Sequence, residues 1–136
     1  MINDGLNLKG KLAISLNGQV VKEVDNIVVT AGKGYVASRM KDATATAMSH
    51  MAIGSGTTNP AAGDTALETE LGRVALTSTS VSSNVVTYTA TFAAGTGTGA
   101  VTEAGILNAS SSGTLLCRTE FSVVNKGSAD SMTITW

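Results

Sequence analysis

The feature that most constrains the fold is a run in which apolar and hydroxyl-bearing side chains alternate, "VVTYTATF" at residues 85–92. Val86, Tyr88, Ala90 and Phe92 fall on one face of an extended segment, and the threonines between them fall on the other. A period of two is typical of a β-strand with one face buried and one face in water. The run therefore predicts a sheet whose apolar side is covered.

Turn signals divide the rest of the chain into similar short segments. Asn17-Gly18 lies between two alternating runs, and both residues accept the positive φ of a type I′ turn, which predicts a β-hairpin over residues 6–26. Further strands are expected at 27–29, 48–56, 74–81, 85–93, 100–107, 114–124 and 131–136. This spacing favours a mainly β fold, an antiparallel β-sandwich of Ig-like or jelly-roll-like type.

One short helix is expected after the third strand. Thr30 is a suitable N-cap, and Gly32 and Gly34 weaken the helix that follows. The residues expected to share one helix face are Tyr35, Val36 and Met40.

A helical turn is expected within "DTALETELGR", residues 64–73. Thr65 and Glu68 have the spacing of a capping box, and Asp64 lies near the positive end of such a turn. Leu67 and Leu71, four residues apart, would then face the core.

Composition limits the functional classes. The 136 residues suit one domain, divided here into an N-terminal hairpin arm (1–25) and a β-sandwich (26–136). Charged residues make up 14% of the chain, against about 25% in a typical domain, so the surface is rich in hydroxyl groups. The net charge is −1 and no basic stripe is present, which argues against nucleic-acid binding. No segment has the length and apolarity of a signal peptide or a membrane span, so a soluble protein made in the cytosol is expected.

No catalytic, metal-binding or cofactor-binding residue is predicted. His50 is the sole histidine, and a zinc site needs several histidine or cysteine ligands, so a structural role is favoured. The "GTGTG" run at 95–99 precedes a strand rather than a helix, which favours a turn over a phosphate loop. Cys117 lies in a predicted strand and is interpreted as a small buried apolar residue.

Three glutamates remain as candidates for acid–base chemistry. Glu68, Glu70 and Glu103 have no spacing that fixes a catalytic pair, and a solvated or salt-bridged state is favoured. Arg73 and Arg118 are their expected partners, with Glu70 and Glu103 as the carboxylates.

The order of these segments resembles the N-terminal attachment domain of bacteriophage tail-collar and tail-fibre proteins. That family has an apolar "hMAhG-G" strand, a Gly/Pro/Thr loop, a "TAL-x-x-E-x-x-R" segment, an "E-x-G-h-h" strand, a short turn and a closing apolar strand, where h is any apolar residue. The matching residues are Met48 to Gly56, Thr65 to Leu67, Glu70, Arg73, Glu103, Gly105 to Leu107 and Gly113 to Arg118. The resemblance covers about residues 25–136, and it implies that the TAL-x-x-E-x-x-R segment shapes the domain. The chain is also similar to short phage structural proteins that begin with an "LNG-x-V…NIVVTAGK" hairpin.

The resemblance implies a non-enzymatic virion structural protein. The sequence ends at Trp136 without a fibre shaft or tip, so a capsid decoration or cement protein is expected, with a short tail, baseplate or tail-fibre-base component as the alternative. A small hydrolase using His50 and a nearby glutamate is a third hypothesis. The expected partners are the major capsid protein or tail proteins and further copies of the chain, without nucleic acid, membrane or cofactor, in a virion assembled in the bacterial cytoplasm. The predicted partner contacts, in the N-terminal arm, are Ile2, Leu6, Leu8, Lys9 and Lys11.

Overall fold

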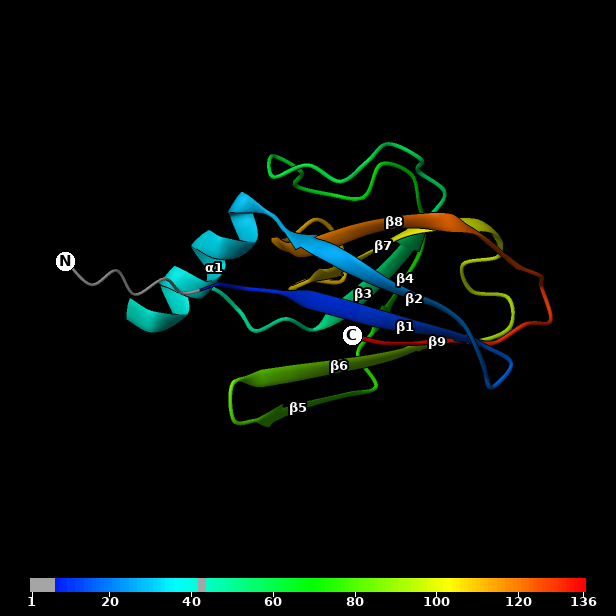
Figure 1. Cartoon of the computed structure of the whole chain (residues 1–136), viewed down its shortest axis with the longest axis horizontal. Coiled ribbons are helices and arrows are strands. Elements are labelled where there is room, and N and C mark those ends of the chain that lie inside the picture. The colour runs from blue at the N-terminus through cyan, green and yellow to red at the C-terminus, as the bar shows by residue number, and fades with distance from the viewer. Residues whose placement is uncertain (1–6, 42–43) are drawn as a thin grey trace.

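The structure, a computed structural model, describes residues 7–41 and 44–136. In this part of the chain nine strands form one antiparallel sheet, in the order β4-β3-β7-β8-β2-β1-β9-β6-β5 (Figure 1). The elements in chain order are β1 (Gly10–Leu16), β2 (Gln19–Val28), α1 (Thr30–Lys41), β3 (His50–Gly54), β4 (Glu70–Ala75), β5 (Ser78–Ser82), β6 (Val85–Phe92), β7 (Gly99–Leu107), β8 (Leu115–Lys126) and β9 (Met132–Thr135).

The sheet curls so that its two halves face each other. Strand β2 forms the corner, because it pairs with β1 along its length but with β8 only at Ile27 and Val28. The core between the halves combines side chains of β1, β6 and β9 with side chains of β3, β7 and β8. Its large members include Leu12, Ile14, Phe92, Met132, Ile134, Met51, Ile53, Ile106, Phe121 and Trp136. The expected mainly β antiparallel class with one short helix is confirmed, and its two layers are the halves of a single sheet.

The alternation in β6 is visible in the burial of its side chains. Ala90 and Phe92 are fully buried and Tyr88 is partly buried, whereas Thr91 is exposed. Val86, on the same face, is exposed. The alternating run therefore marks the buried face correctly, except at the beginning of the strand.

The expected N-terminal hairpin is present. Asn17 and Gly18 have φ values of 50° and 86°, as a type I′ turn requires. The hairpin lies in the middle of the sheet, between β8 and β9, and Leu12 and Ile14 belong to the core. The boundary placed between residues 25 and 26 falls inside β2, so residues 10–25 pack as part of the same sheet as the rest.

The helix α1 is also present where it was expected, beginning at Thr30. It packs on β8 through Gly32, which is buried against the backbone of Leu116. Tyr35 and Val36 are partly buried, whereas Met40 is 77% exposed. The helix extends past the ends of the strands, and its last turn has no sheet beneath it (Figure 1).

The expected helical turn within residues 64–73 is wrong. Residues 64–69 form a loop and β4 begins at Glu70. The backbone N–H groups of Glu68 and Thr69 donate to a carboxylate of β7 instead of to a local cap. The segment 74–81, expected as one strand, is divided between the halves: β4 pairs with β3, and β5 pairs with β6.

The two helix glycines provide a matched test of this packing. A Cβ at Gly32 would lie 2.0 Å from the carbonyl oxygen of Leu116, whereas a Cβ at Gly34 would meet nothing within 4 Å. We predict that Gly32→Ala lowers the free energy of unfolding by about 1–3 kcal/mol, because backbone must move. Gly34→Ala should raise it by about 0.5–1 kcal/mol through helix propensity. Urea unfolding of both variants measures the difference; equal effects would contradict the helix placement.

Candidate functional site

A buried ion pair lies on the outer face of the β7–β8 pair, away from the main core. Glu103 of β7 is 0% exposed and Arg118 of β8 is 2% exposed. Arg118 Nε donates to Glu103 Oε2 at 2.9 Å, and its Nη2 lies at the same distance from that oxygen. Two charges that are removed from water in this way need further hydrogen bonds, because their mutual attraction alone does not offset the loss of hydration.

Glu103 finds those hydrogen bonds in the backbone of the loop that follows β3. Its Oε1 accepts from the N–H groups of Gly56 (3.0 Å) and Thr69 (2.8 Å), and its Oε2 accepts from that of Glu68 (3.0 Å). A Cβ at Gly54 or Gly56 would lie 2.5 or 2.6 Å from Oε1. The other end of the loop approaches as closely, since the same Cβ atoms would lie 2.3 Å from the carbonyl oxygen of Thr69 and 2.5 Å from the Cβ of Glu68. The two glycines of "GSG", at the end of β3 and the beginning of the loop, are therefore required by the close approach of both the carboxylate and the residues 68–69. One side chain thus holds both ends of the loop 55–69.

Arg118 holds the middle of the same loop. Its Nη1 donates to Asp64 Oδ2 at 3.0 Å and its Nη2 donates to the carbonyl oxygen of Thr58 at 3.1 Å. Burial acts to lower the pKa of Arg118, but the hydrogen bonds to Glu103 and Asp64 outweigh it and the pKa is raised. The arginine therefore stays charged. The loop covers this face of the sheet, as the green segment above β7 and β8 in Figure 1 shows.

A second arginine fixes a different turn. Arg73 of β4 pairs with Glu70, with Nη2 2.7 Å from Oε1. Its Nη1 donates to the carbonyl oxygens of Ala109 and Ser112, both at 2.9 Å. The expectation that Arg73 and Arg118 pair with carboxylates such as Glu70 and Glu103 is confirmed, and the structure pairs Arg73 with Glu70 and Arg118 with Glu103. The TAL-x-x-E-x-x-R segment joins the β3–β4 edge to the turn 108–113.

The structure does not bring His50 close to the buried glutamate. His50 pairs with Leu107, and Gly54 pairs with Glu103, so the two side chains belong to opposite ends of the β3–β7 ladder. Four residues of strand separate them by about 13 Å. His50 Nδ1 lies 2.7 Å from the hydroxyl of Ser49. Glu103 is therefore far from the histidine, and its carboxylate already accepts from four N–H groups.

The remaining motifs have structural roles. Cys117 is buried in the core and unpaired, as expected, and burial strongly raises the pKa of its thiol. The "GTGTG" run is a turn leading into β7, as expected, with positive φ at Gly95, Gly97 and Gly99. Among residues 7–41 and 44–136, no group of three or more His, Cys, Asp or Glu side chains is placed to hold a metal ion.

Of the predicted partner contacts, Ile2 and Leu6 lie outside the described residues. Leu8, Lys9 and Lys11 are exposed, and Lys11 Nζ lies 3.7 Å from Glu23 Oε2. These three residues line a hollow of about 650 Å³ at the open end of the curled sheet. Sequence reasoning missed this hollow, because its walls come from segments far apart in the chain and no local pattern marks them.

The chain was compared with known proteins. No protein-family model matches it, and neither the curated proteins nor the solved structures gave a match. In the part of the chain that the structure describes, no helix has both the length and the apolarity needed to cross a membrane.

A substitution of Glu103 tests the role of the buried pair. We predict that Glu103→Gln lowers the free energy of unfolding by about 3–5 kcal/mol, because it leaves Arg118 with less buried counter-charge and turns an amide NH₂ toward backbone donors. Glu70→Gln is the matched control at a more exposed pair and should cost at most about 1 kcal/mol. Chemical denaturation measures both, and similar losses for the two variants would contradict the central role of Glu103.

Two other carboxylates give a pH dependence. A hydrogen bond from Thr58 lowers the pKa of Glu68 below its ordinary value of 4.5, and one from Asn17 lowers that of Asp130 below 3.8. A lowered folded-state pKa means that the charged form stabilises the fold, so this stability is present above the unfolded-state pKa and is lost as pH falls through the folded-state value. Urea unfolding between about pH 6 and pH 3 should show this loss. A Glu68→Gln/Asp130→Asn double variant should lose less stability over this pH range. An equal loss of stability in the variant and the unchanged protein would show that these two carboxylates do not cause the pH dependence.

Proposed function

We propose that this protein is a non-enzymatic structural component of a bacteriophage virion, most specifically a capsid decoration or cement protein. The observation that carries the proposal is the neutral, uncovered edge strand β5. All five of its residues, "STSVS", are exposed, and none is charged. The outer edge of such a strand offers unpaired backbone N–H and C=O groups to another strand.

The contrast between the two edges of the sheet supports this reading. The other edge strand, β4, contains Glu70 and Arg73, and charged residues on an edge discourage pairing with a further strand. Strand β5 has no such protection, and the exposed Val81 adds apolar surface at the same place. Addition of a strand at a sheet edge is a common way to join protein chains. Strand β5 is therefore the surface we assign to contacts with neighbouring subunits.

The contacts of the paired glutamate and arginine side chains support a non-enzymatic role. The carboxylates of Glu103 and Glu70 and the guanidinium groups of Arg118 and Arg73 hold loops in place. The resemblance to tail-fibre attachment domains supports a place in a phage particle. The low charge content of 14% suits a surface that packs against others.

In this proposal the protein is made in the host cytoplasm and becomes part of the virion, as a homo-oligomer in contact with the major capsid protein. Each contact need not be strong, because a subunit that touches two or more neighbours gains from effective concentration. A short tail, baseplate or tail-fibre-base component is the alternative, with tail proteins as partners and the same edge strand as the contact.

The copy number per purified virion separates these locations. We predict a number comparable to that of the major capsid protein, measured by quantitative mass spectrometry. A number equal to one or a few tail rings would move the protein to the tail. Absence from the particle would contradict the structural proposal in both forms.

The edge strand itself is tested by a matched pair of lysine substitutions. Ser80→Lys places a charge in the middle of β5, and Ser128→Lys places one at an exposed turn away from the sheet edges. We predict that Ser80→Lys abolishes self-association and rebinding to depleted virions, while Ser128→Lys retains both. Light scattering and co-sedimentation provide the measurements. Equal behaviour of the two variants would exclude β5 as the contact.

A further inference from the structure

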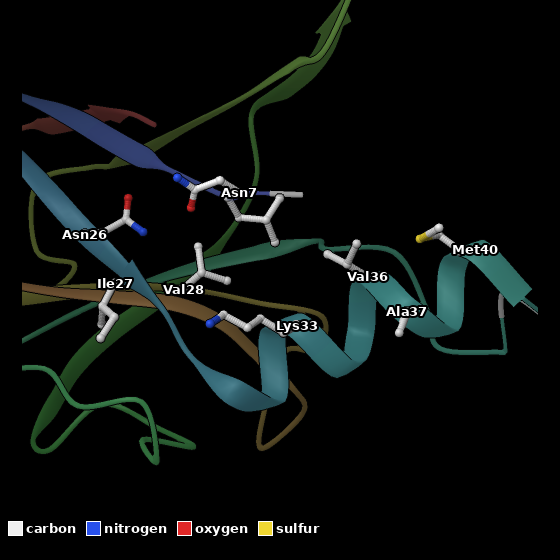
Figure 2. Close-up of a pocket in the computed structure, with 9 residues that line it drawn as sticks. Asn7, Asn26, Ile27, Val28, Lys33, Val36, Ala37 and Met40 are labelled. Atoms are coloured by element: carbon white, nitrogen blue, oxygen red, sulfur yellow. The ribbon is translucent and has the colours of Figure 1, made fainter. Parts of the chain in front are cut away.

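Two adjoining hollows lie where the two halves of the sheet open beneath α1. The larger has a volume of about 650 Å³ and the smaller about 390 Å³, and they share Leu8, Asn26, Val28 and Val36. Figure 2 shows the residues that line the smaller hollow: Asn7, Val28 of β2, and Val36 and Met40, which project from α1. Both volumes lie within the range of small-molecule sites, about 300–1,000 Å³.

The walls of the larger hollow are mainly apolar. The aromatic members are Tyr35, Tyr88 and Trp136, and aliphatic side chains of β2, β6, β7 and β8 complete the larger hollow. Four of the large apolar side chains that the described surface exposes line one or both hollows: Leu8, Met40, Val85 and Val86. Apolar side chains gathered around a concave surface indicate a binding site more strongly than the same residues scattered singly.

The charges around the hollows have one sign. Lys9, Lys11 and Arg39 line the larger hollow and Lys33 lines the smaller, while no aspartate or glutamate among the described residues lines either. The whole chain has ten acidic and nine basic residues, so this local excess is not a consequence of composition. No hydrogen bond or ion pair joins Lys9 to another described residue. Lys11 is paired with Glu23, so Lys9, Lys33 and Arg39 are the charges that favour a ligand with an anionic group.

One buried donor in the wall has no acceptor. Asn26 Oδ1 accepts from Trp136 Nε1 at 2.8 Å, which fixes the orientation of the amide. Its Nδ2 is the one buried side-chain nitrogen or oxygen of the described residues without a hydrogen-bond partner. Buried polar groups are normally paired, so an unpaired donor in the wall of a hollow points to an oxygen supplied by a ligand.

We propose that this joint hollow binds an anionic amphipath: a hydrocarbon chain that ends in a carboxylate, as in a fatty acid. The hydrocarbon chain lies between the two halves of the sheet against Tyr88, Leu116 and Trp136. The carboxylate lies toward Lys9 and Arg39, and one of its oxygens is the acceptor available to Asn26. This site is independent of the β5 edge, so either proposal can fail without the other.

The only tryptophan of the chain provides the measurement, because Trp136 lines the larger hollow. Dodecanoate, kept below its micelle concentration, is titrated into the full chain while tryptophan emission is recorded. We expect a saturable change at one site per chain, with the circular dichroism spectrum unchanged. Dodecyltrimethylammonium, which has the same chain and a cationic head, should give no saturable change.

Two variants and a matched control locate the carboxylate. Lys9→Gln and Arg39→Gln should each weaken dodecanoate binding by about three- to fivefold, as loss of one exposed charge pair does. Lys22→Gln removes the same charge outside the hollow and should leave the affinity unchanged. Absence of saturation, or equal binding of the cationic surfactant, would overturn the proposal. A change in emission that follows protein concentration instead of dodecanoate would also overturn it, by assigning the hollow to a second copy of the chain.

Discussion

The carboxylate of Glu103 is the interaction on which the arrangement of the long loop depends. A buried carboxylate must be surrounded by donors, and the sheet supplies only Arg118. The other donors are backbone N–H groups at the two ends of the loop 55–69. The loop in turn has no regular secondary structure to satisfy these groups. Glu103 and the loop therefore satisfy each other's hydrogen bonds. Gly54 and Gly56 are needed because the carboxylate and residues 68–69 approach the backbone there too closely for a Cβ.

This buried network decides which surfaces remain for function. The loop closes the outer face of β3, β7 and β8, and the second arginine, Arg73, closes the turn 108–113 onto β4. Two parts of the described molecule that stay open are the neutral edge at β5 and the hollow beneath α1. An edge strand suits assembly with other chains, and a cationic, apolar hollow suits a small anionic ligand. The proposed subunit contact at β5 and the proposed ligand site beneath α1 both use surface that the loop and the turn leave uncovered.

Local patterns predicted the strands and the hairpin, because period-two alternation and an Asn-Gly turn are decided by neighbouring residues. That Arg73 and Arg118 pair with carboxylates such as Glu70 and Glu103 was also predicted, but which arginine takes which glutamate is decided by the register of distant strands. The helical turn at 64–73 was wrong for a long-range reason: Glu103, distant in sequence, takes the N–H groups that a cap would have used. The hollow could not be predicted at all, because its walls come from both ends of the chain and from α1, β6 and β8.

Native-state hydrogen exchange of the loop amides tests the central claim most directly. If the buried carboxylate holds the loop, the amide protons of Gly56, Glu68 and Thr69 are protected about as strongly as those within β7 and β8, although they lie outside any strand. Exchange of these three amides as fast as that of an exposed turn residue such as Ser128 would contradict the account. It would show that Glu103 does not hold the loop in solution.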